Sequence, residues 1–305
     1  MVGRSGAIRL GWSAVRDRAG AEQGEAVLAQ ALAAFQAALG SRLVAAYALG
    51  SLAHGGFSPL VSDVDIGLVL ADPLKLKARV TLRSVGNAVR SGGSELHQRL
   101  SVFWGTPGTL QGRSRGGRFP KLDRLDLVEH GRLLAGTDVR CGIARPAQAE
   151  LLVAGAELAL GYLGGDPDLA HRLRHLAARG PRGNDPMTEF RTPAVLLSRG
   201  NRRVTKVVLF PVRFLYTAAT GQVGTNAAAV EHYLAGRRVP AAELVSAALA
   251  WRREPPANDA AVALLSQELL PLYAHYIDDH VERLEAVGSH RLAGRFRRWR
   301  ARLLA

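Results

Sequence analysis

Two aspartates, Asp63 and Asp65, are the side chains of this chain best suited to chemistry. They alternate with apolar residues at the start of the run 63–70, and alternate residues of a β-strand point to the same face. The pattern predicts two carboxylates side by side, which repel each other unless a cation lies between them. Mg²⁺ prefers oxygen ligands of this kind, so the pair is a candidate catalytic metal site. The alternative is a surface strand whose aspartates face water.

A Gly-Ser pair, Gly50 and Ser51, precedes the aspartates by about a dozen residues and follows an apolar run. Backbone N–H groups after a tight turn that begins a helix bind anions, and the Ser51 hydroxyl adds another donor. A triphosphate bound at this turn could be bridged by Mg²⁺ to both aspartates. Phosphoryl-type transfer depends mainly on such positioning and charge neutralisation, so the two patterns together indicate this chemistry.

Hydrophobic periodicity predicts the elements that must position these residues. In chain order we expect helix, strand, strand, helix, strand and helix over residues 24–39, 43–49, 64–70, 74–90, 100–104 and 123–134. The inward face of the helix over 74–90 is expected to carry Leu76, Val80, Val85 and Val89. The candidate residues would therefore lie on a small sheet that is covered by helices.

Strand signals mostly stop after Arg145-Pro146. Helices are expected over residues 147–163, 169–178, 205–219, 226–235, 241–251, 260–286 and 290–303. We therefore expect a poorly ordered segment over 1–22, an α/β domain over 23–146 and a helical bundle domain over 147–305.

Size and charge narrow the functional classes. The chain has 305 residues, enough for two domains, and a net charge of +14 from 40 basic and 26 acidic residues. A basic balance favours an anionic partner such as a nucleotide or RNA, although the arginine usage of a GC-rich genome gives the same bias. No apolar run is long enough to span a membrane, no signal peptide is evident, and the single Cys141 excludes an internal disulfide framework. We expect a cytoplasmic enzyme.

The segment Leu49–Ile66 resembles the signature of the DNA-polymerase-beta-type nucleotidyltransferase superfamily. That signature is a hydrophobic residue with Gly-Ser, a spacer of about a dozen residues, and Asp-hydrophobic-Asp-hydrophobic on a strand. The Gly-Gly and Pro-x-x-Ser-Asp of residues 54–63 are similar to the aminoglycoside nucleotidyltransferases, and residues 207–221 resemble the helix and turn of their helical domain. The resemblance implies an α+β fold, with a small mixed-sheet nucleotidyltransferase domain followed by an all-helical C-terminal domain.

The resemblance also implies an activity, the Mg²⁺-dependent transfer of a nucleoside monophosphate from an NTP to an acceptor hydroxyl. ATP is the expected donor, and the acceptor is a small molecule, antibiotic-like or otherwise, or an RNA. Asp63 and Asp65 would be the catalytic metal ligands, and Gly50 and Ser51 would hold the β- and γ-phosphates. Lys206 would contact phosphate or acceptor. The alternative is a catalytically impaired domain that binds nucleotide or RNA.

Several positions differ from the family's pattern. Ser101 stands where the next strand usually carries a third acid, and Asn226 stands where a phosphate-binding lysine is expected. Arg203 and Lys206 lie near the positions of the acids that meet the cationic antibiotic. A cation-lined acceptor site would repel a polycation.

The third carboxylate stays open between Glu95, Asp123 and Asp126. Asp126 is equally well explained as an exposed residue in the first turn of a helix, where a negative charge is favourable. The basic residues of the loop 105–121 and of the segment 199–206 are candidate phosphate contacts or solvated side chains. The sequence predicts no oligomeric state.

Overall fold

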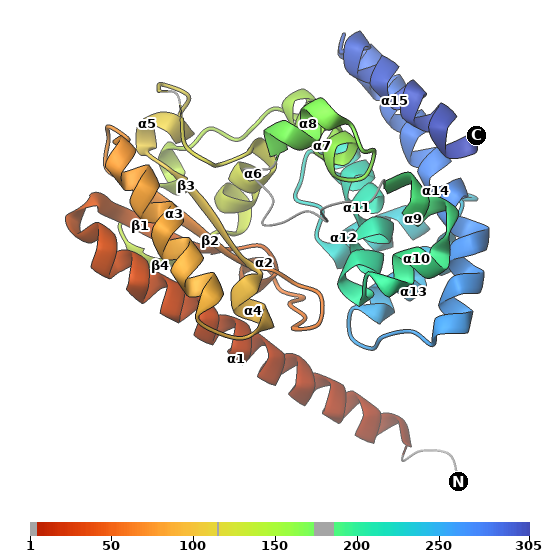
Figure 1. Cartoon of the computed structure of the whole chain (residues 1–305), viewed down its shortest axis with the longest axis horizontal. Helices are drawn as coiled ribbons and strands as arrows, with labels where there is room; N and C mark the ends of the chain where they lie inside the picture. The colour runs from red at the N-terminus through yellow and green to blue at the C-terminus, as the bar shows by residue number, and fades with distance from the viewer. Residues whose placement is uncertain (1–4, 115, 174–185) are drawn as a thin grey trace. The chain divides into compact units, whose positions relative to one another are not determined.

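The structure is a computed structural model that describes residues 5–114, 116–173 and 186–305, with side chains described for 20–114, 116–171 and 186–305 (Figure 1). Its contacts divide the chain into two units. Unit 1 comprises Met1–Phe119 and Asp126–Ala144, and unit 2 comprises Pro120–Leu125 and Arg145–Ala305. The division at Ala144 falls beside the boundary expected near residue 146.

Unit 1 contains one mixed four-stranded sheet. Its strands are β1 (Leu43–Leu49), β2 (Val64–Leu70), β3 (Leu100–Gly105) and β4 (Arg132–Gly136), in the order β3-β2-β1-β4. β1 pairs antiparallel with β2 and β4, and β2 pairs parallel with β3. Three of the strands were expected. The fourth was missed because the helix expected over 123–134 ends at His130, and the chain then forms a short edge strand.

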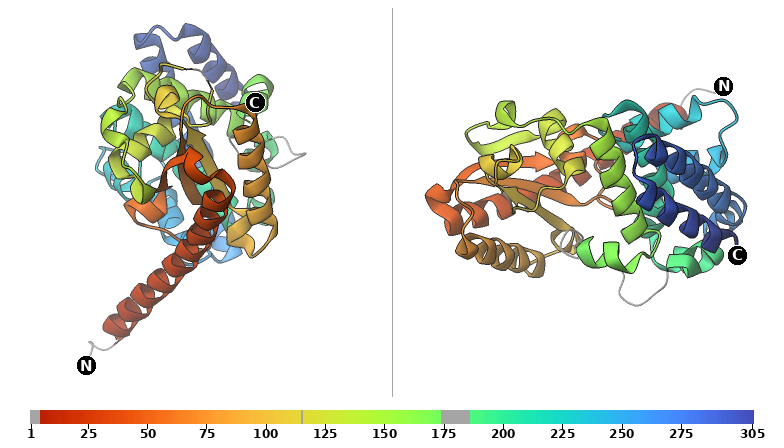
Figure 2. Two further views of the ribbon diagram at one scale, coloured as in Figure 1. Left: turned by 90° about the vertical axis from the view of Figure 1, so that its left-hand side faces the viewer. Right: turned by 90° about the horizontal axis from the view of Figure 1, so that it is seen from above.

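Helices cover both faces of this sheet. The helices of unit 1 are α1 (Ser5–Leu39), α2 (Ser51–His54), α3 (Leu76–Ser91), α4 (Glu95–Gln98) and α5 (Pro107–Leu110), and α6 (Lys121–His130) ends in this unit. α1 and α3 lie side by side on one face, where Leu28 and Phe35 pack with Ile66 and Leu68 (Figure 1 and Figure 2). On the other face, Leu127 of α6 packs in a cluster with Tyr47 and Leu49 of β1.

α1 is longer than the sequence suggested. It begins at Ser5, so the helix includes residues 5–22 of the segment expected to be poorly ordered. Residues 1–4 lie outside the described part of the chain. The pattern that predicted a start at Gly24 depends on buried apolar residues, and the first of these, Val27 and Leu28, lie only in the C-terminal part of α1.

The expected inward face of α3 is wrong at its first half. Leu76 and Val80 are 76% and 61% exposed, whereas Ala78, Leu82, Gly86 and Val89 are buried. The buried set recurs at helical spacing and ends on Val89, which both patterns share. Small residues at two of these positions bring α3 close to the sheet, and that close packing determines the register.

Unit 2 is helical throughout its described residues. Its helices are α7 (Gln148–Tyr162), α8 (Pro167–Leu173), α9 (Pro186–Arg191), α10 (Pro193–Ser198), α11 (Asn201–Thr220), α12 (Asn226–Leu234), α13 (Ala242–Trp251), α14 (Asn258–Ala286) and α15 (His290–Leu304). α11 packs against α7, α12, α13 and α14 and contributes the longest run of buried residues. The C-terminal end of the helix expected over 169–178 lies outside the described residues.

In the described part of the chain, no helix is both long enough and apolar enough to cross a membrane.

Candidate functional site

The pairing of β1 with β2 brings the Gly-Ser turn to the second aspartate. Leu49, the last residue of β1, is opposite Asp65 in the ladder, and Gly50 follows directly. Gly50 has φ 61° and ψ −150°, a conformation open essentially to glycine alone. A Cβ atom at this position would lie 2.4 Å from Oδ2 of Asp65. Gly50 is therefore required both by its backbone conformation and by the carboxylate beside it.

Asp63 and Asp65 flank the fully buried Val64 at the beginning of β2. Both aspartates are half-buried, and the alternation of the strand gives them the face opposite to Val64 and Ile66. The structure thus brings together three of the predicted residues, Gly50, Ser51 and Asp65, with Asp63 two positions before Asp65. Their roles in binding metal and nucleotide stay predictions.

The neighbouring strand β3 carries no acid beside Asp65. In the parallel pairing of β2 with β3, Ser101 is the partner of Asp65, as the sequence alignment of the motif implied. Glu95 lies on α4 and forms an ion pair with Arg99, and its side chain is 77% exposed. Asp123 belongs to unit 2.

Asp126 is the acid that the structure does bring to the turn. Its Oδ2 accepts a hydrogen bond of 2.6 Å from the backbone N–H of Gly50. The residue is only 9% exposed, between the buried Leu125 and Leu127 of α6. The interpretation of Asp126 as an exposed first-turn residue is wrong, because α6 begins at Lys121 and Asp126 falls in its second turn, on a buried face.

A second contact between α2 and α6 lies one helical turn further along. The rings of His54 and His130 meet edge to face with their centroids 5.5 Å apart. His54 is four residues after Gly50, and His130 is four residues after Asp126, so the two contacts are one helical turn apart on both segments. The sequence offered no signal for His130, because the pairing depends on packing between distant segments.

The donor set at the turn consists of carboxylate oxygens, a hydroxyl and backbone N–H groups. Oxygen ligands without sulfur or imidazole suit Mg²⁺, so Asp63 and Asp65 fit such an ion with phosphate and water as further ligands. Within the described side chains, no group of three acidic, histidine or cysteine residues is close enough to hold a metal on its own.

The basic positions expected near the acceptor have other surroundings. Arg203 is buried in unit 2, where its Nε and Nη2 donate to Oε2 of Glu189 at 2.8 and 2.7 Å. Its guanidinium also lies 4.8 Å from the ring centroid of Tyr162. Arg203 is therefore buried and neutralised by Glu189, 2% exposed, inside the helical unit, and its place beside an acceptor stays a prediction.

Lys206 is half-buried on α11, with its Nζ 5.9 Å from the ring centroid of Phe210. It belongs to unit 2, and its contact with a nucleotide or an acceptor stays a prediction. Asn226 is the first residue of α12, whose N-terminus is capped by Thr225 through a hydrogen bond from Ala228 N. Asn226 therefore begins the helix that was expected over residues 226–235.

Several arginines of the C-terminal helix are paired. Arg295 contacts Asp166, Arg297 contacts Glu285, and Arg300 contacts Asp278. These ion pairs lie within unit 2 and join α15 to α14 and to the start of α8. Three of the six arginines of α15 are therefore engaged with acids of the same unit.

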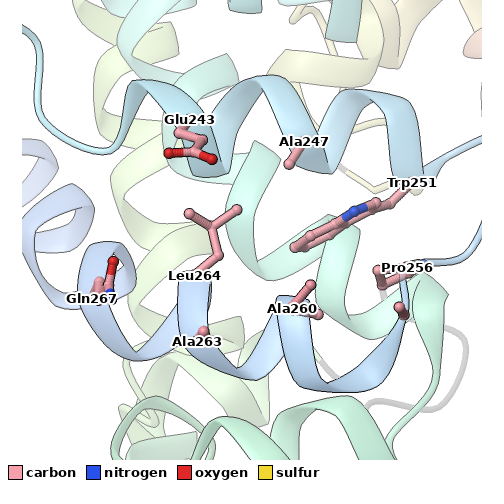
Figure 3. Close-up of a pocket in the computed structure, with 10 residues that line it drawn as sticks. Glu243, Ala247, Trp251, Pro256, Ala260, Ala263, Leu264 and Gln267 are labelled. Carbon is pink, nitrogen blue, oxygen red and sulfur yellow. The ribbon is translucent and has the colours of Figure 1, made fainter.

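A cavity of about 340 Å³ lies between α13 and α14 of unit 2 (Figure 3). Its lining is mostly apolar and comprises Glu243, Ala247, Trp251, Pro256, Ala257, Ala260, Ala261, Ala263, Leu264 and Gln267. None of the predicted site residues is among them. With one carboxylate and one amide in its lining, this cavity is not suited to a triphosphate.

Comparison with known proteins identifies a solved structure with a similar fold. No family model and no curated protein matches the sequence. Among solved structures, spectinomycin adenyltransferase AAD(9) from Enterococcus faecialis, crystallised with ATP and spectinomycin, matches with a TM-score of 0.50. The match covers 80% of this chain and 98% of that chain at 11% identity. The two chains share a fold. This confirms the α+β fold class and the resemblance to aminoglycoside nucleotidyltransferases at the level of fold.

Proposed function

We propose that this protein is a nucleotidyltransferase that transfers a nucleoside monophosphate from an NTP to an acceptor hydroxyl. The observation that carries the proposal is the contact of Gly50 with Asp65 at the end of the β1–β2 pair, with Asp63 at the alternate position. A phosphate-binding turn beside two strand-borne carboxylates supplies the positioning that phosphoryl transfer needs. The shared fold supports the same proposal.

Each residue at the turn has a separate task in this reaction. Asp63 and Asp65 would hold Mg²⁺, which when bound neutralises the phosphates and aligns them. The Ser51 hydroxyl and the amides of the turn would bind and orient the β- and γ-phosphates. The acceptor hydroxyl would lose its proton to water as its oxygen attacks the α-phosphorus, the bond from that phosphorus to the bridging oxygen would break, and pyrophosphate would leave.

ATP is the proposed donor and a small molecule with a hydroxyl is the proposed acceptor. The structural neighbour was crystallised with ATP and spectinomycin, which supports both classes. The ion pair of Arg203 with Glu189 removes one objection to a cationic acceptor, because the charge of that arginine is neutralised within its own unit. An antibiotic-like acceptor is therefore compatible with this position.

A second candidate is a nucleotide-binding module without transferase activity. Ser101, rather than an acid, is paired with Asp65, and this observation favours the second candidate. A carboxylate at that position would be a general base or a further metal ligand. Without one, transfer depends on the two aspartates and the turn.

A transfer screen with α-³²P-labelled ATP, Mg²⁺ and a panel of spectinomycin, other aminoglycosides and tRNA tests the two candidates. We expect label on one small-molecule acceptor, and its loss in Asp63→Asn and Asp65→Asn. Asp259→Asn is the matched control, since it makes the same change at an exposed position in α14. Binding of ATP without transfer to any acceptor would support the binding module instead.

A further inference from the structure

The amide of Gly50 already has an anionic acceptor. Oδ2 of Asp126 lies 2.6 Å from this nitrogen, a short distance typical of a hydrogen bond to a charged carboxylate. Asp126 and Gly50 are 76 residues apart in the sequence, and both belong to unit 1. Gly50 is also the first residue of the turn that is proposed to hold the triphosphate. The protein's own carboxylate therefore occupies a donor at which a phosphate oxygen would bind.

The hydrogen bond from Gly50 engages one of the two oxygens of the Asp126 carboxylate. Oδ1 of Asp126 is buried and has no hydrogen-bond partner, although the residue is more than nine-tenths buried. A buried carboxylate is normally stabilised by several donors, so one that accepts a single bond is held weakly for its degree of burial. A stronger anion that arrives with its own cation can replace it at the Gly50 amide.

The charges around the turn determine whether Asp126 raises or lowers the affinity of the turn for a triphosphate. Asp65 Oδ2 lies against Gly50 on its Cα side, and Asp126 Oδ2 lies at its nitrogen. A triphosphate at this turn meets two carboxylates of its own sign. Mg²⁺ held by Asp63 and Asp65 would neutralise the first of them, whereas Asp126 accepts its hydrogen bond from the Gly50 amide, the donor that a phosphate oxygen would need. Its repulsion would remain until the side chain moves away.

The surroundings of Asp126 allow this movement without rearrangement of the fold. Leu125 and Leu127 on either side of it are buried, and the ring contact of His54 with His130 joins α2 to α6 beyond it. The backbone of α6 is therefore held independently of the Asp126 hydrogen bond. Rotation of the side chain alone would expose the Gly50 amide.

We propose that Asp126 is an internal competitor of the triphosphate for the Gly50 amide and sets the affinity of the turn for nucleotide. This inference rests on the proposed function, because it assigns the triphosphate to the Gly-Ser turn. Asp126 is a positioning residue: it acts through Gly50 and has no assigned contact with the reacting atoms.

Two variants separate the charge of Asp126 from its hydrogen bond. Asp126→Asn keeps an oxygen that can accept from Gly50 but removes the charge, and Asp126→Ala removes both. Isothermal titration with Mg·ATP and with Mg²⁺ and inorganic tripolyphosphate measures the affinity. The expected result is a Kd lowered about tenfold in Asp126→Ala, from the loss of one like charge near the phosphates, and a smaller decrease in Asp126→Asn. Asp259→Asn, the charge control, should leave both dissociation constants unchanged.

The Gly50 amide resonance gives a readout that a merely structural role would not produce. In Asp126→Ala it should shift upfield in the ligand-free protein, and tripolyphosphate should return it downfield. If Asp126→Ala fails to fold, Asp126→Asn decides alone, because it keeps the size and the acceptor.

The outcomes distinguish this inference from the proposed function. Unchanged or weaker binding in folded variants, while the wild type transfers nucleotide, would overturn the inference and leave the function intact. Tighter binding without transfer to any acceptor would support the inference and contradict the transferase. If wild type and variants bind neither ligand, both are wrong.

Discussion

Replacement of Gly50 by alanine tests the geometry on which the site depends. The new Cβ would lie 2.4 Å from Oδ2 and 3.3 Å from Cγ of Asp65, well inside contact distance for the oxygen. The backbone at φ 61° and ψ −150° adds strain, because L-residues with a side chain avoid this region. Both effects act on the same turn, so the variant should lose stability and displace the Asp65 carboxylate.

The expected loss of unfolding free energy in Gly50→Ala is the sum of these two effects. The backbone conformation costs about 1–3 kcal/mol for a residue other than glycine. The overlap with Asp65 adds about 1–2 kcal/mol, since the carboxylate can rotate away but gives up its position. We therefore expect Gly50→Ala to lower the free energy of unfolding by about 2–5 kcal/mol and to abolish nucleotide transfer.

Gly55→Ala is the matched control for strain alone. Gly55 also has a positive φ, 92°, but a Cβ there meets nothing within 4 Å. Urea unfolding followed by circular dichroism gives the loss for each variant, and Gly50→Ala should exceed Gly55→Ala by the cost of the overlap. In a double-mutant cycle, Asp65→Ala should restore that difference. Equal losses in the two glycine variants, or no recovery with Asp65→Ala, would refute the close contact of Gly50 with Asp65.

Three further predictions concern buried and exposed side chains within each unit. Val80→Ser on the exposed face of α3 should change stability by less than about 0.5 kcal/mol, whereas Leu82→Ala should cost about 2–5 kcal/mol; the reverse order in urea unfolding would restore the register expected from the sequence. Arg203→Met should cost about 3–5 kcal/mol, because it removes the hydrogen-bonded partner of the buried Glu189 and leaves it with Arg199 at 3.8 Å, and Glu189→Gln added to it should recover most of the loss in thermal unfolding. Burial lowers the pKa of His280, so the unfolded chain binds the proton more tightly; stability should be constant above pH about 6.5 and fall below it, and His280→Gln should flatten the decrease in unfolding measured from pH 8 to 5.

The part of the site that the sequence predicted depends on local patterns. Gly50 and Asp65 belong to strands that are adjacent in sequence and pair antiparallel, so a short spacer determines their approach. The alternation that sets Asp63 and Asp65 on one face is a property of any strand. The alternation of strands and helices in the N-terminal part and the helical C-terminal part followed from periodicity, whereas the mixed sheet was implied by the family resemblance. The structural comparison confirms the α+β fold class.

What the sequence could not predict depends on packing between distant segments. The inward face of α3 was misjudged because Ala78 and Gly86, not the larger Leu76 and Val80, allow close approach to the sheet. The edge strand β4 has only five residues and little alternation of apolar and polar side chains. The helical periodicity of the residues before it was therefore extended across its first part. Each error lies where a tertiary contact outweighed local propensity.

The partners of the charged residues near the proposed ligands also could not be predicted from the sequence, and these partners affect which ligands the site favours. Arg203, expected to repel a cationic acceptor, is neutralised by Glu189 inside unit 2. Asp126, expected on the surface, is buried at the Gly50 amide, where it opposes an anion. Asp126 and Gly50 are 76 residues apart, and Arg203 and Glu189 are 14 residues apart and on different helices. The net charge of +14 therefore predicted neither effect. The electrostatic preference of the site therefore depends on which charges remain after these internal contacts. If the Gly-Ser turn binds a triphosphate as proposed, the contact of Gly50 with Asp126 would lower the affinity of the turn for it.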